Sequence, residues 1–355
     1  MYRVVLTATR TGKAVAELPV ESFRFTETLN APGSAEVVLA LEPQHGAPTI
    51  TPADIEPVNA SVFVERDGVP MWGGIVWTYE ASVEDMTLTL NAEGPLSYFR
   101  RRYLTTTKTY AQVSGPRIAA DLLEWAQSQP GGWIGVDTST AKDEGQPRDR
   151  TYFDYERVNI GEAVENIAAV RGGFDFRFAP RAWTATSWGW AFTTSYPPTG
   201  RETPRVFTLG GNAEVRGHTV DGTTVANNVD AVGAGEGESL PIENDRDPAL
   251  ALGRSAYPRL DDVLSLSDVR EAPTLRDHAR RRRGRGTKAT AIPDLVVDPA
   301  LLGSFALGDR VGVVGSLGLL RLDGRYRVTE VTVEVAPDAE AVSLAFAPVE
   351  VFDYA

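Results

Sequence analysis

The sequence predicts a mainly β protein with an α+β middle, in which two antiparallel β-barrel domains flank a smaller helix-containing domain. Two residue pairs, Asp67-Gly68 and Asp323-Gly324, lie between runs of alternating apolar and polar residues near opposite ends of the chain. Asp-Gly in such a setting is the strongest short-range signal of a β-hairpin, because both turn residues must tolerate a positive φ. The stretch between these two regions carries helix signals instead.

The length of 355 residues suits two or three domains, each large enough to bury its own core. We expect residues 1–105 to form the first β-barrel domain, 106–215 the α+β middle domain, and 216–355 the second β-barrel domain with one Arg-rich helix. Gly73-Gly74 lies inside a strand pattern of the first domain. It predicts a β-bulge, a common device for bending a sheet.

Two helices are expected in the middle domain. The first covers 114–129, where apolar residues follow one helical stripe after a serine that can cap the helix. The second covers 159–171, because Asn159 and Glu162 have the spacing of a capping box.

Composition excludes several classes of protein. Lys and Arg number 35 against 48 Asp and Glu, and the net charge of −13 argues against a general nucleic-acid binder. Cysteine is absent, which excludes disulfides and a thiol nucleophile. No apolar run reaches the roughly 20 residues of a membrane helix, and the N-terminal run is too short for a signal peptide.

No motif for catalysis, metal binding or cofactor binding is recognisable. The three histidines, His45, His218 and His278, are far apart and lack the spacing of a metal-binding helix. Neither a G-x-S-x-G nucleophile elbow nor a phosphate-binding loop occurs. Neighbouring carboxylates are inevitable among 48 acidic residues, so they do not by themselves indicate the paired acids of a glycosidase. We therefore expect no catalytic, metal or cofactor site.

Trp183, Trp188 and Trp190 form an aromatic group in the middle domain. Rings on one strand face can stack on sugars, which would make a carbohydrate platform. The favoured interpretation is structural: Trp188 and Trp190 alternate along a strand and supply its buried face or a contact between subunits.

A basic run departs from the acidic balance of the chain. It lies on a helix expected to start at Thr274 and to end at Gly284. Cations at a helix C-terminus offset the negative end of the dipole, and Arg suits ion pairs across an interface. We expect the run to contact acidic residues of a neighbouring subunit, with DNA binding as the alternative. The candidate interface arginines are Arg280, Arg281, Arg282, Arg283 and Arg285.

Taken in order, several segments resemble the tail hub, or minor tail, proteins of long non-contractile-tailed phages of actinobacterial hosts. These proteins are similar to the baseplate hub of contractile phages and to type VI secretion spikes. The segments that carry the resemblance are Leu29–Leu39, Val64–Ile75, Phe153–Phe178, Val225–Gly233 and Gly308–Val311. The last two look like parts of the family's second barrel.

The resemblance implies a non-enzymatic structural protein of the virion tail tip, made in the host cytoplasm without a signal peptide. Such hubs are homotrimers in which six barrels form a ring, adapting the six-fold tail tube to three-fold tip proteins around a DNA passage. Implied partners are the distal tail protein or tail tube, the tape-measure protein and tail-tip fibres or spikes. We expect no appended lysozyme or peptidase segment, as some relatives carry.

Two alternatives stay open at this point. A distal tail protein would assemble as a hexameric ring. A carbohydrate-acting cell-wall hydrolase would use the aromatic group at Trp183–Trp190 together with a pair of carboxyl groups.

Overall fold

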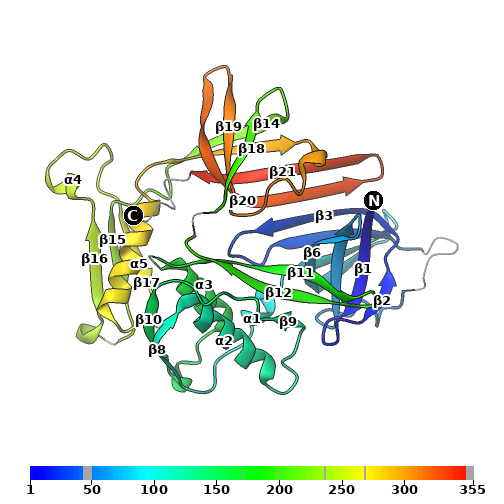
Figure 1. The fold of residues 1–355 in the computed structure, drawn as a ribbon, viewed down its shortest axis with the longest axis horizontal. Helices are drawn as coiled ribbons and strands as arrows, with labels where there is room; N and C mark the ends of the chain where they lie inside the picture. Colours follow the sequence, from blue (N-terminus) through cyan, green and yellow to red (C-terminus); the bar gives the residue numbers. More distant parts are fainter. Residues whose placement is uncertain (43–49, 171, 199, 236, 268, 349–355) are drawn as a thin grey trace.

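The structure is a computed structural model that describes residues 1–42, 50–170, 172–198, 200–235, 237–267 and 269–348. It is mainly β with few helices, and most strand pairs are antiparallel (Figure 1). The predicted class, a mainly β chain with an α+β middle, is confirmed. The domain boundaries at residues 105 and 215 stay predictions.

A first β unit occupies the N-terminal part of the chain. Its strands pair in the order β3-β4-β7-β6-β5-β1-β2. Asp67 and Gly68 both have positive φ and form the predicted turn between β5 and β6. The strands are β1 (Tyr2–Ala8), β2 (Ala14–Glu17), β3 (Val20–Thr28), β4 (Ser34–Ala40), β5 (Ala60–Arg66), β6 (Val69–Ser82) and β7 (Thr87–Glu93).

The predicted bulge at Gly73-Gly74 is wrong. Both glycines pair in regular register with β5, and the register shifts fall at Met71 and Trp77 on either side of them. The glycines serve close packing instead. A Cβ on Gly73 would lie 2.5 Å from the ring of Phe63, so a larger residue has no room.

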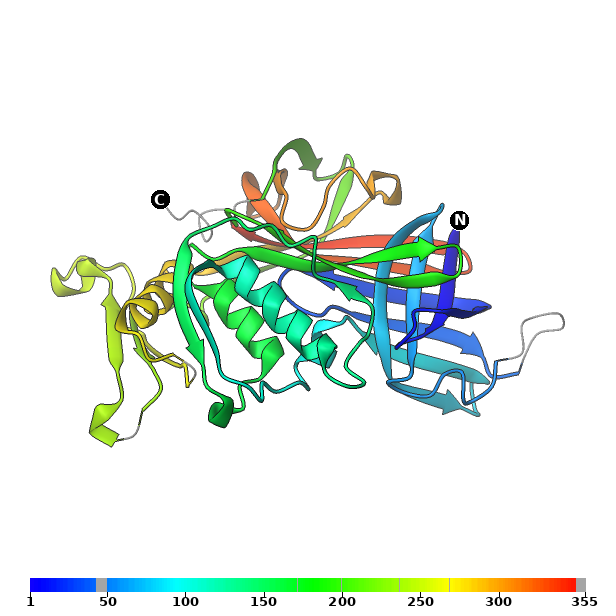
Figure 2. The same cartoon turned by 60° about the horizontal axis from the view of Figure 1, so that its bottom comes forward.

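The middle unit packs two helices and a twisted β-hairpin around a core that also includes Phe63 and Ile75 of the first β unit. Both predicted helices are present, and the Asn159 side chain accepts a hydrogen bond from the Glu162 N–H, as the capping pattern predicted. Figure 2 shows α2 and α3 side by side beneath β11 and β12. The elements are α1 (Leu96–Phe99), β8 (Lys108–Ser114), α2 (Gly115–Ser128), β9 (Val136–Asp137), β10 (Pro147–Tyr152), a 3-10 turn (Asp154–Glu156), α3 (Ile160–Ala169), β11 (Asp175–Thr184) and β12 (Ser187–Ser195).

A second β unit is formed by strands from the C-terminal part of the chain. It is joined to the first unit because β20 pairs with β3, so one sheet runs from β14 to β2. The strands are β13 (Glu202–Thr208), β14 (Ala213–Asp221), β18 (Thr290–Val297), β19 (Arg310–Leu317), β20 (Leu320–Ala336) and β21 (Ala339–Pro348), with a 3-10 turn at Pro299–Leu301.

The hairpin turn predicted at Asp323-Gly324 is wrong. Both residues lie within β20, opposite Val314 and Val313 of β19, and the turn falls at Gly318, where φ is +60°. Leu317 pairs with Leu320, so the turn lies before β20, and buried Leu322 and Val328 of β20 lie on either side of Asp323-Gly324.

A small α/β unit interrupts the β14–β18 hairpin of the second β unit. It consists of a three-stranded sheet, β16-β15-β17, covered by α5. The predicted placement of Val225–Gly233 in the second barrel is therefore wrong, because β15 belongs to this separate sheet. The elements are β15 (Asn228–Val232), a 3-10 turn (Gly237–Ser239), β16 (Ile242–Arg246), α4 (Pro248–Ala251), β17 (Asp261–Ser265) and α5 (Ala272–Arg285).

The two β units repeat one another in their pairing. The series β3-β4-β7-β6-β5 matches β14-β18-β21-β20-β19, and every pair in both series is antiparallel. The next strand differs, because β1 pairs antiparallel with β5 whereas β13 pairs parallel with β19. The β6–β7 register skips Trp77, and the β20–β21 register skips Thr329. When β6 and β20 are aligned so that Trp77 matches Thr329, Val62 and Val64 of β5 take the positions of Val311 and Val313 of β19. These four valines are fully buried.

Candidate assembly site

The arginine run lies on α5, which extends from Ala272 to Arg285 and ends at Gly286. The helix thus begins two residues before the predicted Thr274 and continues through Gly284. A Cβ added at Gly284 would meet no atom within 4 Å, and this glycine is half-buried inside the last turns of the helix.

Arginines on one side of α5 pair with carboxylates of the small sheet beneath it. Alternate residues of β16 face the helix, and Arg280 and Arg283 both pair with Asp245. Arg282 Nε lies 2.6 Å from the Asp262 carboxylate of β17. The acidic partners of these three arginines therefore lie in this chain. The predicted contact between the run and a neighbouring subunit stays a prediction.

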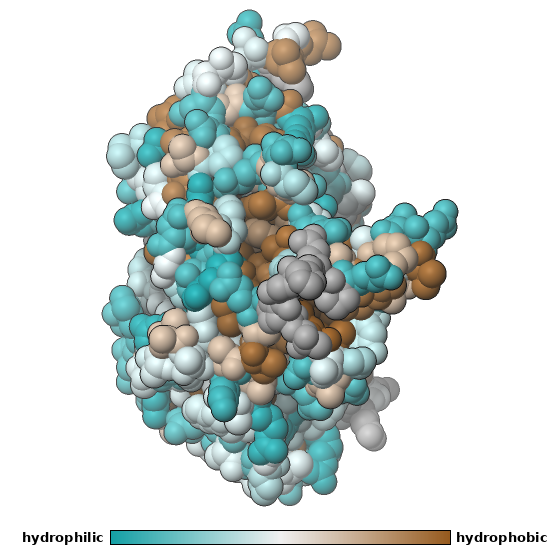
Figure 3. All heavy atoms as spheres, turned by 90° about the vertical axis from the view of Figure 1, so that its right-hand side faces the viewer, coloured by the Kyte–Doolittle hydropathy of each residue, from teal (hydrophilic) through white to brown (hydrophobic). Residues whose placement is uncertain are grey.

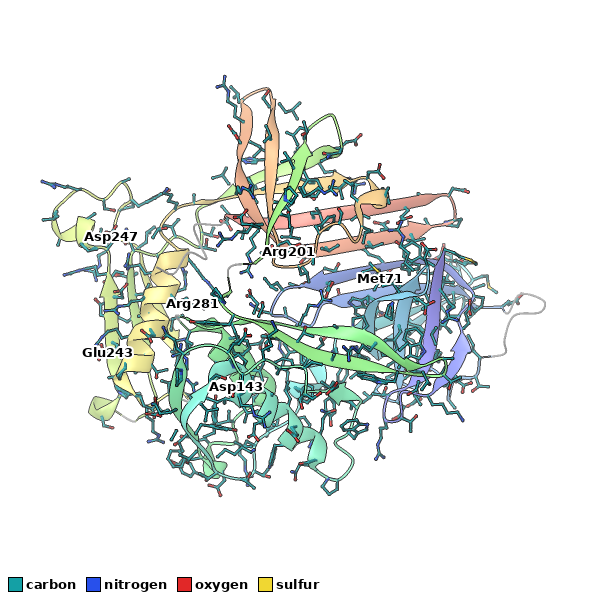
Figure 4. All side chains as sticks on the ribbon, viewed as in Figure 1. Met71, Asp143, Arg201, Glu243, Asp247 and Arg281 are labelled. Carbon is teal, nitrogen blue, oxygen red and sulfur yellow. The ribbon has the colours of Figure 1, made fainter. Side chains whose placement is uncertain are left out.

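The opposite side of α5 packs against the middle unit. Arg281 is buried, and its Nη1 donates a hydrogen bond to the Val170 carbonyl at the end of α3 (Figure 4). His278 is also buried, and burial together with Arg150, Arg148 and Arg281 lowers its pKa to about 3. The imidazole is neutral at neutral pH, which avoids a further positive charge among these guanidinium groups.

Arg285 lies half-buried in the last turn of α5. The helix therefore lies between two parts of the chain: one face forms ion pairs with the small sheet, and the other face packs against the middle unit. An ion-paired helix in this position serves packing within the chain.

Trp188 and Trp190 lie on β12 in the core between the middle unit and the first β unit. They are 2% and 1% exposed, and the Phe63 ring centroid lies 4.9 Å from that of Trp190. The Trp190 indole N–H donates to the Gly73 carbonyl at 3.0 Å. Trp183 is different, because it is 40% exposed at the end of the hairpin. The two buried rings supply the inner face of a strand, in agreement with the structural interpretation of the pattern.

A buried ion pair joins the middle unit to the second β unit. Arg327 of β20 is fully buried and pairs with Asp175 at the start of β11. The same carboxylate accepts a hydrogen bond from Asn30 Nδ2 at 3.0 Å, and the Asn30 side chain in turn accepts one from the Phe176 N–H. Arg327 Nε donates to the Gly308 carbonyl at 3.1 Å. Three parts of the chain therefore meet at one hydrogen-bonded cluster.

A cavity of about 390 Å³ opens beside this cluster. Arg201 lies at its edge and pairs with Asp309 at 3.0 Å (Figure 4). Each carboxylate on its wall faces an arginine. This is the arrangement of a structural junction, with charges matched in pairs.

The described part of the chain brings together no group of histidine and carboxylate side chains that could hold a metal ion. His218 lies on β14 and His278 on α5, while His45 falls outside the described residues. No described helix has the length and apolar character needed to cross a bilayer.

Comparison with known proteins was made by sequence and by structure. No family model matches the sequence, and no curated protein matches it. The 43 kDa tail protein of prophage MuSo2 from Shewanella oneidensis superposes with a TM-score of 0.61 at 12% identity, over 99% of this chain and 100% of that one. The chain has a phage tail protein fold.

Two further structures share this phage tail protein fold. The tail protein from Neisseria meningitidis MC58 has a TM-score of 0.59 at 13% identity, over 99% of this chain and 98% of that one. The E. coli c3393 protein is described as a type VI secretion component similar to the T4 tail proteins gp27 and gp5. It has a TM-score of 0.51 at 14% identity, over 97% of this chain and 76% of that one. The predicted resemblance to tail hubs and type VI spikes is confirmed at the level of the fold. The long non-contractile tail and the actinobacterial host stay predictions.

Proposed function

We propose that this chain is a structural protein of a phage tail tip, the hub on which tip proteins assemble. The observation that carries the proposal is the repeat of two matching β units in one chain, within a fold that covers the full length of a phage tail protein. Three such chains supply six equivalent β units. A trimer of this kind matches a six-fold tube on one side and three-fold proteins on the other.

The central passage of the ring admits the genome without binding it. A net charge of −13 repels the phosphate backbone, so DNA slides past the protein rather than adhering to it. The partners in this account are the tail tube or distal tail protein, the tape-measure protein and tip fibres or spikes. The protein resides in the virion, at the tail tip.

The hydrolase alternative lacks its aromatic platform. Trp188 and Trp190 point into the core and offer no ring face to a sugar, so Trp183 is the exposed ring of that group. The distal tail alternative differs from the hub in stoichiometry, because a distal tail ring contains six chains.

The mass of the assembled protein distinguishes the two structural alternatives. We expect native mass spectrometry to give three times the 38.4 kDa of one chain. Six chains in the particle would favour the distal tail protein. A monomer at every concentration tested would contradict both.

A further inference from the structure

Several strands of the large sheet, β2 and β13 among them, have one edge without a strand partner among the described residues, and the edges of β14 and β6 are the two that matter here. β14 pairs with β18 and leaves its other edge open. The C-terminal half of β6 pairs with β7, but β5 leaves β6 at Ile75, so the edge from Thr78 to Ser82 is open. Most of that segment is exposed. Unpaired N–H and C=O groups on such an edge are a template for another strand.

The contact between the two β units within the chain is also formed by a terminal strand of one unit and the open half-edge of a long strand of the other. β19 leaves β20 at Arg327, and the open edge of β20 beyond that point is filled by β3 over Glu330–Val335. In the repeat, β3 corresponds to β14 and β20 corresponds to β6. The strand pair that joins the first β unit to the second therefore has an unfilled counterpart in the open edges of β14 and β6.

We propose that β14 of one copy pairs antiparallel with the C-terminal half of β6 of the next copy. The partner is thus a second copy of this chain, and the inference rests on the proposed ring. The contact is heterologous, joining the second β unit of one copy to the first β unit of the next. Because it repeats the geometry of the contact within the chain, one rotation relates neighbouring units throughout, and the proposed three-copy ring requires that rotation to be about one sixth of a turn.

The register follows from the repeat. Tyr79 corresponds to Val331, since each lies two residues beyond the skipped residue of its strand. Within the chain Val331 faces Glu27. Tyr79 pairs with Leu90 and Val331 pairs with Leu344, so Leu90 corresponds to Leu344. When the pairing is followed from these two leucines through β4 to β3, and through β18 to β14, Val220 takes the position of Glu27. Tyr79 of one copy therefore faces Val220 of the next.

Exposed apolar side chains support this register. Tyr79 is 38% and Val220 61% exposed, and both are large apolar residues on otherwise open strand edges. Their pairing would bury two side chains that the single chain leaves in water. At the position of β20 that is equivalent to Tyr79, Val331 is buried. Figure 3 shows the end of the molecule nearest the first β unit, with apolar residues gathered at its middle and polar residues around them.

Disulfide trapping tests the register, because the chain contains no cysteine of its own. The double variant Tyr79→Cys, Val220→Cys should form covalent trimers on mild oxidation, seen as a three-chain band on a non-reducing gel. Residues directly opposite in an antiparallel pair have Cβ atoms about 4.5–5.5 Å apart, and the short end of that range meets the upper limit of about 4.5 Å for a disulfide. A mixture of the two single variants should give linked dimers, while each single variant alone should give none.

Two controls define the register and the folded state. Glu80→Cys with Val220→Cys moves one cysteine to the other face of the strand and should link at least tenfold less. Glu27→Cys with Val331→Cys uses the contact within the chain and should form a disulfide without a change of chain mass. Both substituted positions of the test pair are exposed, so far-ultraviolet circular dichroism should match the unmodified protein.

The outcomes separate this inference from the proposed function. Cross-linked products of two and three chains, with none larger, support both the strand pairing and the hub proposal. Native trimers in which Tyr79→Cys, Val220→Cys links no better than the Glu80→Cys control overturn the strand pairing and leave the hub proposal standing. Linkage that continues beyond three chains overturns the closed three-copy ring.

Discussion

Replacing Asp175 with Ala should lower the free energy of unfolding by about 3–5 kcal/mol, because it removes one partner of a buried ion pair. Arg327 is fully buried, so its guanidinium would lose its charge partner in a place that water does not reach. The substitution also takes the hydrogen-bond acceptor from Asn30. Urea unfolding followed by circular dichroism measures the effect.

A matched control lies at the edge of the same cavity. Arg201 pairs with Asp309 but is 70% exposed, so Arg201→Ala should cost at most about 1 kcal/mol. Equal and small losses in the two variants would show that Asp175 and Arg327 do not hold the units together. A selective loss in Asp175→Ala, with Asp175→Asn intermediate, would establish the junction as a main source of stability.

Replacing Trp190 with Ala should lower the free energy of unfolding by about 3–5 kcal/mol, the usual cost of emptying a large aromatic site. The ring is 1% exposed and packs on Phe63, and its N–H bond to Gly73 is lost as well. Trp188 would then border a cavity on the same strand. Thermal and urea unfolding of the variant should both show the loss.

Trp183→Ala is the control for the aromatic group, since this ring is 40% exposed and its removal should change stability by less than about 1 kcal/mol. A Trp190→Ala variant with unchanged stability but lost binding to host cell-wall glycans would contradict the structural account and favour the carbohydrate platform.

Local signals predicted those parts of the fold that local geometry decides. Asp67-Gly68 forms its turn because its two residues adopt positive φ between strands of matching register. Asn159 caps α3 because its side chain reaches an N–H three residues away. Asp323-Gly324 carries the same sequence signal, yet the pairing of β19 with β20 places it inside a strand. Tertiary register outweighed turn propensity there.

The junction and the internal repeat could not be predicted from the sequence. Asp175 and Arg327 are 152 positions apart, and nothing in either segment marks the other as a partner. The two β units share pairing and register while their residues differ, as Tyr79 and Val331 do at one equivalent position. The arginines of α5 were found by their charge, but their carboxylate partners became evident only when β16 and β17 were placed beneath the helix.

Electron microscopy of the assembled wild-type protein tests the central claim most directly. The account predicts a ring of three copies with six similar lobes around an open centre, three-fold when aligned without imposed symmetry. The three small α/β units that contain α5 should break the six-fold appearance. A ring with true six-fold symmetry, or a particle without an open centre, would contradict the claim that three chains supply six equivalent β units.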